Sequence, residues 1–188
     1  YQVAEGVALE GVSRGGLFVY NWAKRNPDKV ACIYAEAPVC DIKSWPMGEG
    51  KYQGSAQDVE GMLQAYGFRD RAEALAYRGN PIDGLDALAQ YKVPMLHLIG
   101  MNDHIVPPEE NTLILVDRYI RAGGIATVYP NTRGHEYLEG HHFEIDDPGF
   151  IADFIYRNYV SRTVALPSSN YHQLRRGCTQ AFRKFRQT

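Results

Sequence analysis

Residues 11–16 read Gly-Val-Ser-Arg-Gly-Gly and place Ser13 between two glycines. An apolar, strand-like run precedes this motif, and an amphipathic helical pattern follows it. A G-x-S-x-G motif between a strand and a helix is typical of a nucleophile elbow, a sharp turn that exposes the serine hydroxyl. We expect this turn to exclude side chains at Gly11 and Gly15. The alternative is a Gly/Ser-rich turn without chemistry, but the flanking elements favour Ser13 as a nucleophile at a helix N-terminus, where negative charge is stabilised.

A serine hydroxyl needs a base to take its proton, and the base needs a carboxylate to orient it. Residues 93–100 are apolar enough for a buried strand, and Asp103 follows that strand directly. Parallel α/β sheets form their sites at the carboxyl ends of the strands, so Asp103 is the candidate acid. An Asx turn or cap before a helix starting near Pro107 is the structural alternative. Asp41, which follows the strand-like run Ala31–Ala35, is the alternative acid.

Three histidines lie in the long segment between the strand-like run Ile125–Tyr129 and a final helix predicted over Gly149–Tyr159. A base for Ser13 is expected in such a loop, after the acid in chain order. We choose His141, with His142 as the second candidate and His135 as the third. We expect one member of the adjacent pair to have a structural role.

The remaining histidines are assigned no chemistry. His97 lies within a predicted strand and is expected to be a core histidine, whereas His104 and His172 have no partner pattern.

The elbow, the segment Gly100-x-x-Asp103-x-x-Val106-Pro107 and the segment Gly140-His141-His142-Phe143 together resemble the α/β-hydrolase superfamily over residues 1–160. The resemblance implies a mostly parallel sheet flanked by helices. It also implies a serine hydrolase with a Ser-Asp-His triad, no cofactor and no metal. The backbone N–H of Arg14 would then be one oxyanion donor. A complete domain of this kind places further strands and a second donor before the elbow. We therefore expect this chain to be the C-terminal portion of an enzyme that lacks the N-terminal strands.

Within the superfamily, the serine segment and residues 35–41 resemble bacterial esterase-like members, some of them linked to an SGNH-type esterase domain. This resemblance implies a small-molecule ester substrate, with carbohydrate acyl esters as one class, and a periplasmic or secreted protein. A prolyl-oligopeptidase-like serine peptidase is the first alternative. An inactive fragment or interaction module that needs a missing N-terminal segment is the second.

The segment 41–92 is longer than a plain connection between two strands requires. It contains helical patterns over Ala56–Tyr66 and Arg69–Tyr77, and we expect a lid over the nucleophile, with simple decoration of the sheet as the alternative. Trp45 and Tyr52 are candidate pocket walls. Substrate contacts are expected from three side chains: Arg14, Trp45 and His142.

Charge divides the chain into two parts. The net charge is −2, and residues 161–188 contain six Lys and Arg and no Asp or Glu, so residues 1–160 carry −8. The basic stretch contains a Leu-Pro-Ser-Ser-Asn break and no recognisable nucleic-acid-binding fold. We interpret 161–188 as a linker or tail and expect no nucleic-acid partner. The resemblance described above implies that this segment leads to a second, SGNH-type domain.

The sequence predicts neither a membrane-spanning segment nor a metal site. No run of eighteen apolar residues predicts a membrane span. Cys32, Cys40 and Cys178 have no metal-ligand spacing. The first two flank one extended run of about 26 Å, too long for a disulfide, and are predicted to fill apolar space.

Overall fold

The structure is a computed structural model that describes residues 6–131 and 134–163, so the predicted tail lies almost entirely outside the described residues. Four parallel strands form one sheet in the order β1-β2-β3-β4. The strands are β1 (Val7–Val12), β2 (Val30–Glu36), β3 (Pro94–Gly100) and β4 (Ile125–Asn131). The predicted α/β class with a mostly parallel sheet is therefore confirmed.

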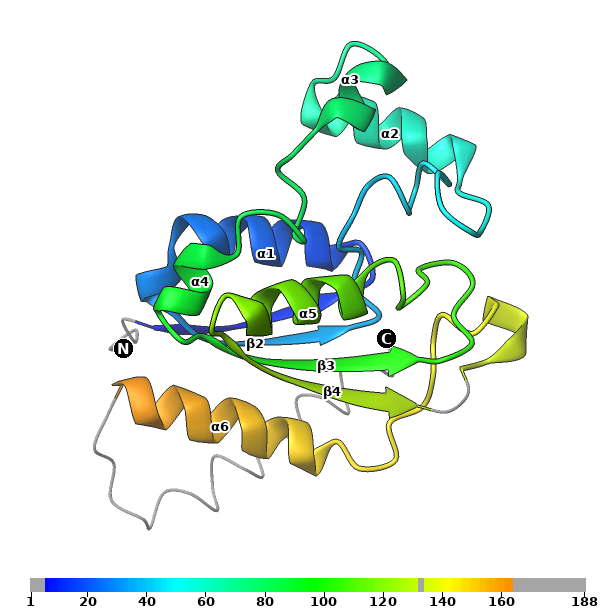
Figure 1. The fold of residues 1–188 in the computed structure, drawn as a ribbon. Coiled ribbons are helices and arrows are strands. Elements are labelled where there is room, and N and C mark those ends of the chain that lie inside the picture. The colour runs from blue at the N-terminus through cyan, green and yellow to red at the C-terminus, as the bar shows by residue number, and fades with distance from the viewer. Residues whose placement is uncertain (1–5, 132–133, 164–188) are drawn as a thin grey trace.

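Helices cover both faces of the sheet (Figure 1). One face carries α1 (Gly15–Arg25), α4 (Asp86–Gln90) and α5 (Thr112–Arg121), and the other carries α6 (Gly149–Thr163). The helices α2 (Ala56–Tyr66) and α3 (Arg71–Ala76) project beyond the first layer, and two short 3-10 turns lie at Pro27–Lys29 and Glu136–Leu138. The segment 41–92 thus contains a separate helical pair above α1, and its role as a lid stays a prediction.

Burial follows position in the sheet. Every residue of β2 is buried, because this strand has a neighbour on each side and helices on both faces. β1 lies at one edge of the described sheet and leaves Val7 exposed, and the adjacent helix exposes Phe18 (74%) and Trp22 (42%). One apolar cluster joins Trp45 to α2 and to Leu17 of α1, which fixes the projecting helices to the elbow helix.

The helix expected near Pro107 begins five residues later, at Thr112, and this boundary was wrong. Residues 107–111 form turns instead, in which the Pro108 carbonyl accepts N–H groups from Asn111 and Leu113. The Asn111 side chain is committed elsewhere, because its Oδ1 accepts the N–H groups of Cys40 and Asp41. The Asn111 side chain therefore fixes this loop to the segment after β2, just before the helix starts.

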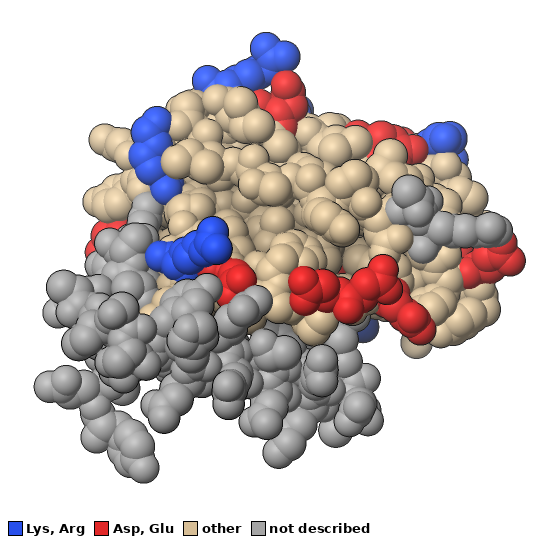
Figure 2. All heavy atoms as spheres, turned by 90° about the horizontal axis from the view of Figure 1, so that it is seen from below, with Lys and Arg blue, Asp and Glu red and all other residues tan. Residues whose placement is uncertain are grey.

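The final helix agrees with the pattern at its start. The Oδ1 atom of Asp147 accepts the N–H of Gly149 at 2.8 Å, as expected for an acid at this helix N-terminus. Figure 2 shows the face that carries α6, along which Asp and Glu side chains form a row. The residues that lead into this helix include exposed Glu144 and Asp146.

Candidate active site

The turn between β1 and α1 holds Ser13 in a strained backbone conformation, with φ at +50°. Its N–H donates to the carbonyl of Glu36 at 2.9 Å, and its carbonyl accepts N–H groups from Gly16 (3.0 Å) and Val39 (2.9 Å). Left-handed backbone costs energy at a residue with a side chain and persists where the surroundings enforce it. Hydrogen bonds to β2 and to the segment after it provide that enforcement, and Ser13 lies at the carboxyl end of the sheet.

The glycines of the motif differ in how closely other atoms approach them, and only Gly11 is confined in the way that was expected. A Cβ at Gly16 would lie 2.7 Å from the carbonyl oxygen of Val39, and one at Gly11 would lie 3.1 Å from the Val19 side chain. A Cβ at Gly15 would meet no atom within 4 Å. The steric explanation for Gly15 was therefore wrong. The close approach occurs at Gly16, where α1 passes the segment after β2.

Asp103 lies in the loop after β3 and is 2% exposed. Its Oδ1 accepts the N–H groups of Ile105 (3.0 Å) and Val106 (2.8 Å), which leaves Oδ2 directed at His141. This is the Asx-type turn that was the structural alternative for the residue. Asp103 can form the turn and still orient the histidine, because the turn uses one carboxylate oxygen and fixes the orientation of the other.

His141 is brought to Asp103 by a loop that packs against the acid loop at glycine positions. A Cβ at Gly140, which has φ at +81°, would collide with the Asn102 carbonyl, and one at Gly100 would lie 2.6 Å from the Gly140 carbonyl oxygen. The two loops are also joined by a 2.9 Å hydrogen bond from the His104 N–H to the Glu139 carbonyl. Residues without side chains at the crossing therefore allow the two loops to come into backbone contact.

These loops bring the three residues selected from the sequence into one hydrogen-bonded chain. The Nδ1 atom of His141 lies 2.8 Å from Asp103 Oδ2, and its Nε2 atom lies 2.8 Å from Ser13 Oγ. His141 is 5% exposed, so the imidazole is largely shielded from water. With the proton on Nδ1, the lone pair of Nε2 faces the serine hydroxyl, which is the arrangement that general-base activation of a serine requires.

The alternative acid and bases lie outside this chain of contacts. The Asp41 carboxylate accepts the N–H of Lys43 at 3.0 Å, and burial raises its pKa. His142 packs beside His141 with ring centroids 4.6 Å apart, and His135 lies 5.2 Å from the Tyr137 ring. Asp103, rather than Asp41, is the acid that reaches the imidazole.

The predicted substrate-contacting residues Arg14 and Trp45 lie next to one another. The Arg14 guanidinium is 5.9 Å from the Trp45 ring centroid and donates to Asp58 Oδ1 at 3.0 Å. Asp58, on α2, escaped the sequence reasoning, because an acid after a helix cap is an ordinary surface residue. Tyr52 stacks on His104 at 4.6 Å, so His104 has a partner that its sequence context did not reveal.

His97 is fully buried on β3, as expected for a core histidine. Its Nε2 atom lies 2.6 Å from the Tyr20 hydroxyl. Burial lowers the pKa of His97 to about 4 and raises the pKa of Tyr20 well above its ordinary value. Both side chains are therefore uncharged at neutral pH, inside the core between β3 and α1.

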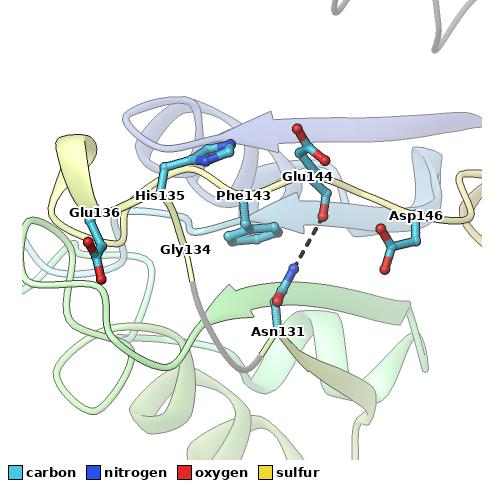
Figure 3. Close-up of a pocket in the computed structure, with 7 residues that line it drawn as sticks. All are labelled: Asn131, Gly134, His135, Glu136, Phe143, Glu144 and Asp146. Atoms are coloured by element: carbon cyan, nitrogen blue, oxygen red, sulfur yellow. Dashed lines mark hydrogen bonds between the residues drawn. The ribbon is translucent and has the colours of Figure 1, made fainter.

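A pocket of about 470 Å³ opens beside the histidine loop. Figure 3 shows its lining, in which the Asn131 side chain donates to the Glu144 carbonyl at 3.2 Å. The lining residues are Asn131, Gly134, His135, Glu136, Phe143, Glu144 and Asp146. None of the three residues that form the serine, histidine and aspartate chain lines this pocket, so it is a separate feature.

Across the described residues, no three His, Cys, Asp or Glu side chains gather in a cluster able to hold a metal ion. No helix in the same part of the chain is long and apolar enough to cross a membrane. Cys32 and Cys40 are both buried, and neither forms a disulfide within the described residues.

Comparisons with known proteins give a family match and a set of similar folds. The sequence profile of the prolyl oligopeptidase family matches residues 1–144, a range that includes Ser13, Asp103 and His141. No curated protein gives a significant match.

Three solved structures illustrate the similarity of fold. A puromycin-hydrolyzing peptidase of Mycobacterium tuberculosis has a TM-score of 0.56 and 17% identity, covering 86% of this chain and 22% of that one. The acylaminoacyl peptidase of Pyrococcus horikoshii has a TM-score of 0.55 and 14% identity, covering 83% and 24% of the two chains. Acetyl xylan esterase 1 of Thermoanaerobacterium sp. JW/SL YS485 has a TM-score of 0.50 and 18% identity, covering 82% and 46%.

The chain spans less than half the length of each of these proteins. At such identities the likeness concerns the fold, which is that of the α/β hydrolases, whereas the profile match covers most of the sequence. The chain belongs to the prolyl oligopeptidase family of serine hydrolases.

Proposed function

We propose that Ser13, His141 and Asp103 form the catalytic triad of an acyl hydrolase whose preferred substrate is a carboxylic ester. The observation that carries the proposal is the pair of 2.8 Å contacts of the His141 ring, one to Ser13 Oγ and one to Asp103 Oδ2. A buried carboxylate on one side of an imidazole and a strained serine on the other is the constellation that activates a hydroxyl for attack on a carbonyl.

In the proposed reaction, Ser13 Oγ attacks the carbonyl carbon while its proton passes to His141 Nε2. Asp103 holds the imidazole in the required tautomer and stabilises the imidazolium. In the part of the chain that the structure describes, the Arg14 N–H has no hydrogen-bond acceptor, so it is free to donate to the oxyanion. His141 then returns the proton to the leaving alkoxide, and water repeats the sequence on the acyl-enzyme.

The family match favours a second candidate, a serine peptidase. The same triad serves both reactions, and the solved relatives include two proteins named as peptidases and one named as an acetyl xylan esterase. The esterase resemblance of the serine segment supports the ester, and a carbohydrate acyl ester is the finer form of the proposal. An ester has a better leaving group than an amide, so hydrolysis of an activated ester is expected in either case, and amide turnover discriminates between them.

The test compares esters with amides in the intact protein, and an acetyl ester and an acetylated p-nitroaniline share one acyl group. We expect p-nitrophenyl acetate and acetylated xylo-oligosaccharides to be hydrolysed, and acetylated or prolyl p-nitroanilides to be poor substrates. A higher kcat/KM for the anilides would replace the ester proposal by the peptidase. Ser13→Ala should lower kcat by about a millionfold, as removal of a triad nucleophile does.

The histidine assignment has a matched control. His141→Gln should abolish turnover, whereas His135→Gln, in the same loop but away from Ser13, should retain it. Full activity of the Ser13 or His141 variant would refute the triad.

A further inference from the structure

The residue directly after the proposed nucleophile carries a cation. Arg14 ends the elbow turn as the N-cap position of α1, and its side chain is 66% exposed. Within the described part of the chain, its guanidinium pairs with Asp58, from Nη1 to Oδ1 at 3.0 Å, and lies 5.9 Å from the centroid of Trp45. Because Arg14 directly follows Ser13 in the chain, its positive charge would influence a charged substrate group that extends from the nucleophile toward Trp45.

The ion-pair partner is itself held in place. The Oδ2 atom of Asp58 accepts the Ser55 hydroxyl at 2.6 Å, and Ser55 caps α2 by accepting the N–H of Asp58. Val59, the next residue, is buried in the apolar cluster that also contains Trp45. Helix capping and apolar packing therefore fix the carboxylate, and the carboxylate fixes one nitrogen of the guanidinium.

The ion pair uses only some of the N–H donors of the Arg14 guanidinium. A guanidinium has five N–H donors in a rigid plane, and two parallel donors match the two oxygens of a carboxylate. Asp58 engages Nη1, and no acceptor for Nε or Nη2 is present among residues 6–131 and 134–163. Because its other carboxylate oxygen is occupied by Ser55, Asp58 orients the fork and leaves an edge open to a ligand.

From this arrangement we propose that Arg14 is the specificity-determining residue for a substrate carboxylate, and that Asp58 and Trp45 position its guanidinium. The inference rests on the proposed acyl hydrolase and narrows its substrate class to compounds with an anionic group near the scissile bond. Arg14 then has two separate functions. Its backbone N–H serves every substrate through the oxyanion, and its side chain selects those that carry a carboxylate.

The experiment compares anionic substrates with neutral analogues of similar size in the intact protein. One pair places the charge in the acyl group: mono-p-nitrophenyl succinate against p-nitrophenyl 4-methylpentanoate. The other places it in the leaving group: 4-acetoxybenzoate against methyl 4-acetoxybenzoate. For each pair, the measured quantity is the ratio of kcat/KM for the anionic substrate to kcat/KM for the neutral one.

Arg14→Gln should lower this ratio about tenfold in one of the two pairs, since a hydrogen bond between charged groups contributes on the order of that factor. The backbone donor is unchanged, so its contribution cancels in the ratio. Arg14→Lys should recover part of the loss, because it retains the charge without the fork. Arg121→Gln is the matched control, since Arg121 forms a similar exposed ion pair with Asp117 on α5. Its ratios should equal those of the unchanged protein.

The inference is overturned if, for both substrate pairs, the ratio measured for Arg14→Gln lies within twofold of the ratio measured for the unchanged protein. Absence of turnover of the neutral esters by the unchanged protein would instead count against the proposed function. The two failures are therefore distinguishable. A loss confined to the first pair assigns the carboxylate to the acyl group, and a loss confined to the second assigns it to the leaving group.

Discussion

Replacing Asp103 by asparagine should cost more activity than the loss of one charge suggests. The Oδ1 atom of Asp103 accepts two backbone N–H groups, from Ile105 at 3.0 Å and Val106 at 2.8 Å, and Oδ2 faces His141. An asparagine has one oxygen, and two donors compete for it against one ring nitrogen. The amide oxygen will therefore stay with the backbone donors, and the NH2 group will face His141.

This orientation selects the wrong tautomer of the base. An NH2 group that donates to His141 Nδ1 requires the imidazole proton to lie on Nε2, and Nε2 faces Ser13 Oγ at 2.8 Å. A protonated Nε2 cannot accept the serine proton. The flipped amide would leave one buried and one part-buried backbone donor unsatisfied, at about 1–3 kcal/mol for the buried one, so it would be rarely populated. We expect kcat to fall by about ten-thousandfold, the loss that this substitution produces in other Ser-His-Asp triads.

The assay is p-nitrophenyl ester hydrolysis at pH 7, with thermal unfolding to show that the variant is folded. Asp41→Asn is the matched control, because Asp41 also follows a strand of the sheet but its carboxylate contacts only the Lys43 N–H within the described residues. We expect the control to remain within a few-fold of the unchanged protein. A folded Asp103→Asn protein within tenfold of full activity would refute the tautomer argument.

Two further predictions concern stability. Gly16→Ala should lower the free energy of unfolding by about 1–3 kcal/mol, because the added Cβ would lie 2.7 Å from the Val39 carbonyl oxygen. A Cβ at Gly15 would meet no atom within 4 Å, so Gly15→Ala should leave the free energy of unfolding in urea unchanged or raise it. An equal loss of stability in the two variants would contradict this steric explanation. Burial lowers the pKa of His97 to about 4, so the unfolded chain takes up a proton below pH 6.5 that the folded protein does not. Between pH 7 and pH 4 the unchanged protein should therefore lose about 3 kcal/mol more stability than His97→Gln, and parallel pH profiles would exclude this role for the histidine.

Strong local patterns made several parts of the molecule predictable. The helix predicted over Ala56–Tyr66 occurs with those bounds, and the parallel strands follow the apolar runs. Boundaries were less predictable where side chains act at a distance. The start of α5 depends on Asn111, whose amide bonds to residues about seventy positions earlier. Such a contact cannot be predicted from the residues that neighbour Asn111 in the sequence.

The sequence alone determined the order and identity of the chemical groups, because a G-x-S-x-G turn, an acid after a buried strand and a histidine before the last helix are local patterns. It could only rank His141, His142 and His135 as candidate bases, since histidines in the same loop differ little in sequence context. Only the tertiary structure decided which ring lies between Ser13 and Asp103, through the close crossing of two loops at glycine positions. The structure also decided the surroundings of Arg14, because a helix more than forty residues later supplies its partner. Local sequence encodes backbone conformation and reactive groups, whereas distances between groups far apart in the chain exist only once the sheet and its loops have assembled.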